Sequence, residues 1–439
     1  MNTVQQMKEN GVVGAGGAGF PTYVKAQSQA EIVLVNAAEC EPLLHKDKQL
    51  LLHATDLFFQ GLQTLMGLVS ASKGIIGIKK KHTGLIAHLN ERLPVQVELC
   101  PVDDFYPAGD ELTLIRETTG VIIGPGALPI SRGIVVSNVE SLYNIGTARP
   151  VTTKFLNVGG AVEKRQTFEV PLGISFQEII DYACPTIRDF TIIEGGPMMG
   201  KIVEDLSLPV TKTTAGLLVF PQDHVLIQKY RIMASEKRVN QIGKAACDQC
   251  TICTELCPRY LLGHPIQPHK AMRSLVFHQD GAGENEIQTH ALYCCQCNLC
   301  SFVSCPEGLF PSQVCINNRA KALTKKIQYQ GALENEPHPL APYRKTPSKR
   351  LKRMLNLDLF PDSGDLSEHQ FAPQTLRLLL RQHIGAPATP VVSVGDQVQQ
   401  GQKIATVGDA LGAEIHAPLA GQVSEVDDQA ITLTLAYSE

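Results

Sequence analysis

Two dense cysteine runs constrain this chain more than any other feature. The first is spaced C-x2-C-x2-C-x3-C, begins at Cys247 and ends at Cys257 before a proline; the second begins at Cys294, 37 residues after Cys257, and ends at Cys305 before Pro306. Three thiolates at two-residue gaps can hold one corner of an iron–sulfur cube, and the Cys before Pro typically ligates the other cluster. The pattern predicts one [4Fe–4S] cluster on Cys247, Cys250, Cys253 and Cys305, and a second on Cys294, Cys297, Cys300 and Cys257.

Other cysteine chemistries fit this pattern less well. Zinc sites use two C-x2-C pairs rather than triplets that end in Cys-Pro. A disulfide framework is typical of short secreted chains, whereas this chain has 439 residues and its N-terminus lacks the pattern of a signal peptide. Cys295 lies beside Cys294, but only Cys294 keeps the C-x2-C-x2-C spacing. We expect the cysteines outside the two runs to be buried free thiols: Cys40, Cys100, Cys184 and Cys315.

Length, charge and hydropathy narrow the class of protein further. A chain of 439 residues is expected to form about three domains. Its charges are mixed and its formal net charge is -4, so we expect no nucleic-acid partner. The longest apolar runs have the length of strands, well short of the roughly 20 residues that cross a bilayer. Because clusters of cysteine thiolates assemble in a reducing compartment, we expect a cytoplasmic protein that does not span a membrane.

Composition and periodicity predict an α/β multidomain protein. Residues 1–150 alternate buried strand runs with helical patterns, which favours a parallel, covered sheet in a Rossmann-like domain. Residues 151–224 have the hairpin, helix and strand order of a β-grasp domain, with Ser175 as the expected helix N-cap. Residues 225–330 are expected to be helical and carry the cysteines, and residues 331–375 have the composition of a linker. Residues 376–439 resemble the barrel-sandwich fold of lipoyl carriers, but the hairpin tip Gly408–Glu414 lacks the carrier lysine.

A glycine-rich loop near the N-terminus is the second candidate site. Gly14, Gly16 and Gly19 match G-x-G-x-x-G, with Gly17 between them. A dinucleotide fingerprint follows a strand and opens a helix, whereas the residues before this loop have a helical pattern and Pro21 disfavours helix just before it. The loop is nevertheless suited to hold a phosphate, because glycines let backbone N–H groups approach an anion. The alternative is a tight structural turn.

Four segments together resemble a known family. They are Gly14–Lys25 (GAGGAGFPTYVK), Asn36–Pro42 (NAAECEP), Tyr106–Glu111 (YPAGDE) and Ser137–Ser141 (SNVES). They resemble the NADH-oxidising flavoprotein subunit of respiratory complex I and the RnfC protein of Rnf electron-transport complexes. The resemblance extends over the β-grasp, ferredoxin and barrel-sandwich regions, so it covers nearly the whole chain.

The resemblance implies an FMN site that is served by NADH. The glycine loop and Lys25 would meet the FMN phosphate and NADH, and Lys25 supplies a compact positive charge. Acidic side chains would face the nicotinamide, where carboxylates can hold ribose hydroxyls, and Glu111 is the expected catalytic residue. The full set of expected cofactor-binding residues is Gly14, Gly16, Gly17, Gly19, Phe20, Lys25, Asn36, Glu39, Glu41, Tyr106, Gly109, Asp110, Glu111 and Asn138.

Departures from complex I favour one branch of this family. Ala15, Ala38 and Ser137 replace residues found in complex I, and RnfC proteins carry their barrel-sandwich segment before the flavin domain rather than after it. This order resembles the cobalamin reductases of bacterial propanediol-utilisation microcompartments. The implied activity is NADH-dependent electron transfer through FMN and two [4Fe–4S] clusters to cobalamin cobalt, with a shell protein or a neighbouring enzyme as a further partner inside a microcompartment. The alternatives are a peripheral Rnf-like electron-transport protein that passes electrons to partner redox proteins, and a scaffold whose clusters are redox spectators.

Overall fold

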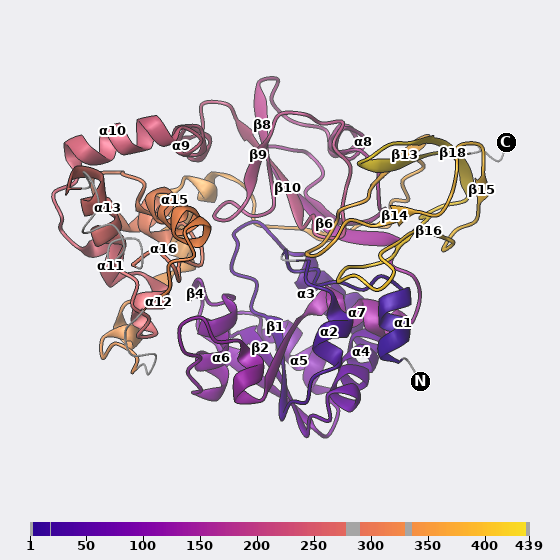
Figure 1. Cartoon of the computed structure of the whole chain (residues 1–439), viewed down its shortest axis with the longest axis horizontal. Coiled ribbons are helices and arrows are strands. Elements are labelled where there is room, and N and C mark those ends of the chain that lie inside the picture. Colours follow the sequence, from indigo (N-terminus) through magenta and orange to yellow (C-terminus); the bar gives the residue numbers. More distant parts are fainter. Residues whose placement is uncertain (1–2, 18, 278–289, 330–335, 436–439) are drawn as a thin grey trace.

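The computed structural model describes residues 3–17, 19–277, 290–329 and 336–435 (Figure 1). Its first region is built on a four-stranded sheet in the order β3-β2-β1-β5, in which every pairing is parallel. The strands are β1 Ile32–Ala37, β2 Lys73–Lys79, β3 Val97–Val102 and β5 Ile134–Asn138. The predicted parallel sheet at the N-terminal end of the chain is therefore present.

Helices cover both faces of this sheet because alternate strand residues point to opposite sides. Leu34 and its neighbours pack against helix α6, whereas Val33 and Val35 lie in the core shared with helices α4 and α7. Helices α4 and α7 approach closely at Gly61 and Gly146, where a Cβ would lie 1.8 Å from Leu142 O and 1.9 Å from Leu57 O. The helices of this region are α1 Val4–Glu9, α2 Thr22–Ala26, α3 Lys46–His53, α4 Thr55–Leu68, α5 Thr83–Asn90, α6 Glu111–Thr119 and α7 Val139–Thr147.

A second, mixed sheet follows, in the order β12-β7-β6-β10-β8-β9. Its hairpin of β6 and β7 precedes α8, and the Ser175 hydroxyl caps that helix by accepting a hydrogen bond from Glu178 N at 3.2 Å, as the sequence predicts. The elements are β6 Thr153–Gly160, β7 Gln166–Pro171, α8 Phe176–Ala183, β8 Phe190–Glu194, β9 Lys201–Val203 and β10 Gly216–Pro221.

The cysteine-bearing region is helical and lies apart from the C-terminal module (Figure 1). Its elements are α9 Val225–Met233, α10 Glu236–Ala246, α11 Ile252–Glu255, α12 Pro258–Leu261, α13 Pro268–Phe277, the π-helical turn η2 Cys300–Ser304, and α15 Pro311–Thr324. Among the described residues, no helix is both long and apolar enough to cross a membrane.

Residues 336–375, the described part of the segment expected to be a linker, form short elements that contact other regions. Strand β11, Thr346–Pro347, pairs with β4, Phe105–Tyr106, and is followed by helix α16, Ser348–Met354. Strand β12, Asp365–Leu366, pairs with β7. The polar composition that suggested a linker is used here for contacts between regions, such as the hydrogen bond from Ser348 Oγ to Asp104 Oδ1 at 2.7 Å.

Two small sheets form the C-terminal module, in the orders β13-β19-β18-β15 and β14-β16-β17. The strands are β13 Thr375–Leu379, β14 Thr389–Pro390, β15 Gln397–Val398, β16 Lys403–Thr406, β17 Ile415–His416, β18 Gly421–Val426 and β19 Ala430–Thr434. The module lies next to α1 and the second sheet, on the far side of the molecule from the cysteine region (Figure 1).

Candidate functional site

The glycine-rich loop connects α1 to α2 and closes on itself. Val13 forms a β-bridge with Pro21, and Gly14 N donates to Phe20 O at 2.8 Å. Gly17 has φ +113°, a backbone conformation that glycine adopts without strain. The N–H groups of Gly16, Gly17 and Phe20 make no hydrogen bond to a described residue. With no partner among the described residues, these donors fit the predicted role of the loop in holding a phosphate.

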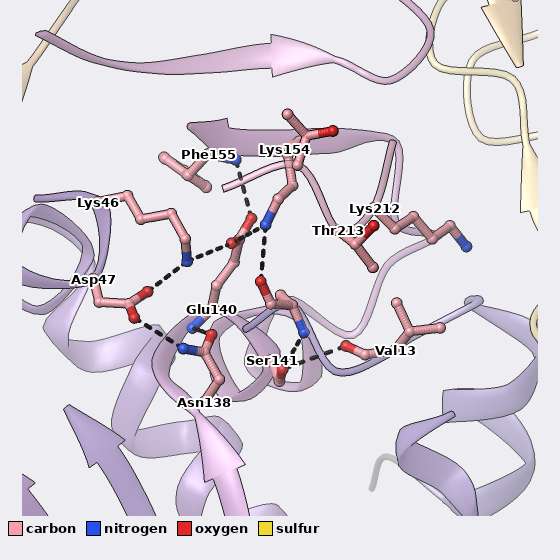
Figure 2. A network of polar contacts seen from close by, with 12 residues as sticks. Val13, Lys46, Asp47, Asn138, Glu140, Ser141, Lys154, Phe155, Lys212 and Thr213 are labelled. Carbon is pink, nitrogen blue, oxygen red and sulfur yellow. Dashed lines mark hydrogen bonds and ion pairs between the residues drawn. The ribbon is translucent and has the colours of Figure 1, made fainter. Parts of the chain in front are cut away.

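A buried charge network contacts the backbone of this loop (Figure 2). Glu140 of α7 accepts from Lys46 Nζ at 3.0 Å, from Phe155 N at 3.0 Å and from Lys154 Nζ. Lys154 Nζ also donates to Ala15 O at 3.3 Å, and Lys46 Nζ donates to Asp47 Oδ1 at 2.6 Å. The network therefore joins α3, α7 and β6 to the backbone of the glycine loop.

The charges of this network balance. Two lysines face two carboxylates, and each of the four side chains is at most 6 % exposed. Burial lowers the pKa of Lys46, but the Asp47 and Glu140 carboxylates outweigh that effect and raise it overall. Burial lowers the pKa of Lys154 to about 8, against the attraction of Glu140. Sequence reasoning gave none of the four residues a role, although Glu140 lies in the Ser137–Ser141 segment, because the sequence does not show which charged residues will be buried together.

Asn138, a predicted FMN contact, lies at the edge of the same network. Its Oδ1 accepts from Glu140 N at 2.9 Å and caps α7, while its Nδ2 donates to Asp47 Oδ2 at 2.8 Å (Figure 2). A Cβ on Gly16 would lie 3.3 Å from the Cβ of Asn138. The structure thus brings Asn138 and the glycine loop together.

Lys25 and Asn36 lie on the sheet side of the candidate site. Lys25 Nζ donates to Val136 O at 2.8 Å, and Asn36 Nδ2 donates to Gly109 O at 2.7 Å. Burial lowers the pKa of Lys25, while the nearby Glu111 carboxylate raises it. The predicted residues Lys25 and Glu111 are therefore close enough to interact, and Gly109 lies against the end of β1.

Two partly buried acids, Glu39 and Glu41, follow β1. Glu39 Oε1 accepts from Glu41 N at 2.8 Å, and Glu41 Oε2 accepts from Met198 N at 2.8 Å. Glu41 Oε1 is buried and has no hydrogen-bond partner among the described residues. Burial raises the pKa of Glu39, and it raises the pKa of Glu41 to about 8. A protonated Glu41 would carry an unused donor or acceptor, which fits a residue that faces a bound cofactor or nucleotide.

The Tyr106–Glu111 segment faces the cysteine region. Tyr106, which is 1 % exposed, donates from its hydroxyl to Cys297 O at 2.8 Å. Asp110 caps α6 through Thr113 N at 3.1 Å and accepts two hydrogen bonds from Arg259, at 2.9 and 2.8 Å. Arg259 lies two residues after Cys257. The structure therefore gives Tyr106 and Asp110 partners beside the second cysteine site.

The loop 195–200, which sequence reasoning missed, bridges the same two regions. Met198 N donates to Glu41, and Met198 O accepts from Asn298 Nδ2 at 2.6 Å. A Cβ on Gly196 would lie 2.1 Å from Glu41 Oε2, so only glycine permits this approach. The repeated glycines at 195–196 were the signal in the sequence that a backbone must pass close to another group.

The first cysteine site has the composition that the spacing predicts. A small cavity is lined by Cys247, Cys250 and Cys253 of the first run and by Cys305 of the second run, together with His269 and Met272. Cys250 is exposed, whereas Cys253 is buried. Four thiols from both runs around one cavity suit a [4Fe–4S] cluster, with Cys305 as the crossed ligand.

At the second cysteine site, two thiols from outside the predicted set lie beside the predicted ones. Cys257 and Cys300 are buried and lie close enough to Cys294 for the thiols to interact, and the buried Cys315 is a further neighbour of Cys294. The Cys295 thiol contacts Cys297. Cys294 and Cys295 therefore both lie at the second cysteine site. Cys315, which we expected to be only a buried free thiol, lies beside Cys294.

Family models match three parts of the chain. The Nuo51 FMN-binding domain matches residues 7–147, the 4Fe-4S dicluster domain matches residues 246–310, and the RnfC barrel sandwich hybrid domain matches residues 365–436. These matches confirm the flavin-type α/β region, the iron–sulfur region and the barrel-sandwich module that the sequence predicted.

Curated relatives match over a longer span. Cobalamin reductase PduS of Salmonella typhimurium is 43 % identical over 98 % of this chain and 95 % of its own length. Cobalamin reductase PduS of Citrobacter freundii is 42 % identical over 98 % of this chain and 95 % of its own length. A component of the Na⁺-translocating ferredoxin:NAD⁺ oxidoreductase complex of Acetobacterium woodii is 32 % identical over 57 % of this chain and 56 % of its own length. The chain therefore belongs to the family of cobalamin reductase PduS.

Proposed function

We propose that this protein takes electrons from NADH on an FMN, and passes them singly through two [4Fe–4S] clusters to the cobalt of cobalamin. The full-length similarity to cobalamin reductases supports the acceptor. The FMN-binding and dicluster family matches support the cofactors. Bound FMN would supply the conversion of a two-electron donor into one-electron steps, which is chemistry that the protein itself lacks.

The chain's own residues have distinct roles in this proposal. The N–H groups of Gly16, Gly17 and Phe20 would bind the FMN phosphate, with Lys25 as the nearby cation. Asn36, Asn138 and Gly14 would shape the FMN site, while the acids near β1 and Glu111 would orient the nicotinamide and its ribose. We retain Glu39, Glu41, Tyr106, Gly109, Asp110 and Gly19 as residues of this site.

The contact between the flavin-side segments and the second cysteine run is the observation that carries the proposal. Tyr106 donates to Cys297 O, and Glu41 reaches Asn298 through Met198. Asn298 lies between two of the predicted cluster cysteines. The first-run site, in contrast, includes the exposed Cys250. We therefore propose that electrons leave the flavin beside the second run and leave the protein near the first.

A rapid-mixing experiment on the anaerobic holoprotein tests the function. NADH should bleach the flavin absorbance, and electron paramagnetic resonance should then show reduced clusters. Added aquocobalamin should reoxidise the protein with the spectrum of reduced cobalamin appearing at a matching rate. A protein that dithionite reduces but NADH does not would contradict the proposal.

The cluster order has a separate test. Cys250→Ser should remove the first-run cluster and leave NADH-dependent reduction of the other cluster intact. Cys300→Ser should remove the second-run cluster, after which dithionite but not NADH should reduce the first-run cluster quickly. Iron content and resonance spectra measure each loss independently of activity. If Cys300→Ser leaves NADH reduction of the first-run cluster at its original rate, the proposed order is wrong.

A partner protein as acceptor is the second candidate. The similarity to a component of an ion-translocating complex over 57 % of the chain supports it. Holoprotein that is reduced by NADH yet transfers electrons to a ferredoxin faster than to aquocobalamin would favour this candidate. The β-grasp assignment of residues 151–224, a cytoplasmic location and enclosure in a microcompartment with shell or enzyme partners also remain proposals, supported by the family resemblance.

A further inference from the structure

The C-terminal module contacts the glycine loop directly. Ile384 N donates to Gly19 O at 3.0 Å. Gly19 has φ +67°, and a Cβ there would lie 3.1 Å from the His383 Cα and 2.9 Å from Thr213 Cγ2. A second contact joins Lys8 Nζ of α1 to Gly408 O, in the hairpin of the module, at 2.7 Å. The Gly19 end of the glycine-rich loop therefore lies between Thr213 and the segment His383–Ile384, both of which are distant from it in sequence.

Lys212 ties these segments together. It is 2 % exposed, and its Nζ donates to Gly11 O and to Glu414 O, each at 2.7 Å. Its backbone N–H donates to Gln382 Oε1 at 3.1 Å. Gly11 has φ +66°, and a Cβ there would lie 2.5 Å from Lys212 Nζ. One side chain from residues 151–224 thus holds the start of the flavin loop against the C-terminal module (Figure 2 shows Lys212 and Thr213 beside the loop).

The hydrogen bonds of Lys212 suit a permanent contact between the loop and the C-terminal module. Both acceptors are backbone carbonyls, which cannot titrate. Burial lowers the pKa of Lys212 to about 7, against the attraction of Glu414. A neutral amine still has two N–H donors, so both hydrogen bonds survive the loss of the proton. The groups that also face Lys212 are His383 and His416 of the module.

We propose that the C-terminal module is a fixed clamp on the flavin loop and that Lys212 is its positioning residue. The clamp holds the two ends of the loop, at Gly11 and Gly19, so that the N–H groups between them stay available to a phosphate. Carrier domains of the same fold move a prosthetic group, whereas this module stays docked. The inference rests on the proposed function only in that FMN is the ligand of the loop.

Lys212→Met tests the clamp, because methionine keeps an apolar stem and removes both donors. FMN is removed and added back to the otherwise intact protein, and its dissociation constant is measured by quenching of flavin fluorescence. We expect FMN to bind at least about tenfold more weakly, with iron content unchanged. Lys403→Met is the matched control: Lys403 lies in the module, is 40 % exposed and reaches Glu414 only at 3.9 Å. The control should keep the original affinity.

A purely structural role would lower the urea midpoint of Lys212→Met and leave the FMN affinity of the folded protein unchanged. That result, or an affinity within about twofold of the original, would overturn the clamp. If Lys212→Met fails to fold, hydrogen exchange on the unaltered protein decides the matter. Because coupling between sites is reciprocal, FMN should slow exchange at the Ile384 amide by at least about fivefold, and unchanged exchange would overturn the clamp. If the unaltered protein binds no FMN, both the clamp proposal and the proposed function are wrong. If Lys212→Met binds FMN normally, only the clamp proposal is wrong.

Discussion

Replacing Glu140 with glutamine should destabilise the flavin region strongly. Glu140 is 1 % exposed and accepts from two lysines and one backbone amide. Glutamine keeps the shape but removes the charge, so two buried lysines are left with Asp47 alone. Breaking a buried pair by removing one partner costs about 3–5 kcal/mol. The variant can limit that cost by releasing the proton of Lys154.

The free-energy cost of deprotonating Lys154 depends on its pKa, which burial lowers to about 8. That pKa includes the attraction of Glu140, so it falls further in the variant and the amine loses its proton at pH 7 at a cost below about 1.4 kcal/mol. We therefore expect the variant to lose about 3 kcal/mol of unfolding free energy at pH 7. In the variant, the folded-state pKa of Lys154 falls further below its unfolded value, so the folded state binds fewer protons than the unfolded state and stability rises with pH. The gap to the original protein should narrow as pH rises from 6 to about 8.

Urea unfolding followed by tyrosine and flavin fluorescence at pH 6, 7 and 8 measures this gap. The control is Glu98→Gln, because Glu98 is 51 % exposed and pairs with Lys73 at the surface. Its loss should stay within about 0.5 kcal/mol. A loss below about 1 kcal/mol for Glu140→Gln, or a gap that widens as pH rises, would refute the reasoning.

Three further predictions concern the cofactor sites. Glu111→Gln should keep FMN and iron but slow NADH-dependent flavin reduction at least about tenfold, about 1.4 kcal/mol of barrier; stopped-flow absorbance with dithionite as the control measures this, and an unchanged rate would remove Glu111 from the nicotinamide site. Cys295→Ser should keep both clusters and Cys294→Ser should lose one; the opposite result in iron analysis would make Cys295 the ligand and Cys294 the partner of Cys315. Burial raises the pKa of Glu41 to about 8, so the folded state binds the extra proton and stability falls as pH rises from about 4.5 to 8; Glu41→Gln should flatten this slope in urea midpoints from pH 5 to 8, and an identical slope would show that Glu41 does not titrate there.

Local patterns predicted the parts of the fold whose signals lie within a few residues. Apolar runs marked the parallel strands, and Ser175 marked the start of α8, because caps and strand burial act over short distances. Cysteine spacing predicts a crossed site, and Cys305 lines one cavity together with three cysteines of the first run. These features need no knowledge of how the regions pack.

Contacts between distant regions of the chain could not be predicted from local sequence patterns. The run Lys79-Lys80-Lys81 has the composition of a solvated strand end, yet Lys79 is 3 % exposed and pairs with Asp104 at 2.8 Å, whereas Lys80 is 61 % exposed. The difference is decided by the packing of β11 and α16 over this edge, which no local pattern reports. The same holds for Lys212, whose partners lie about 200 residues away on either side.

The docking of the C-terminal module bears on how domain order can change in this family. RnfC proteins, which this chain resembles, carry the module ahead of the flavin domain. Here the module contacts α1 through Lys8 and Gly408 and the glycine-rich loop through Ile384, and none of these contacts involves the peptide of residues 336–375 that leads into it. Moving the module's coding segment to the front of the gene, with a flexible joint into α1, would leave every docking contact available. The two chain orders can therefore be circular permutations of one assembly, separated by a change in connectivity and not by a change in architecture.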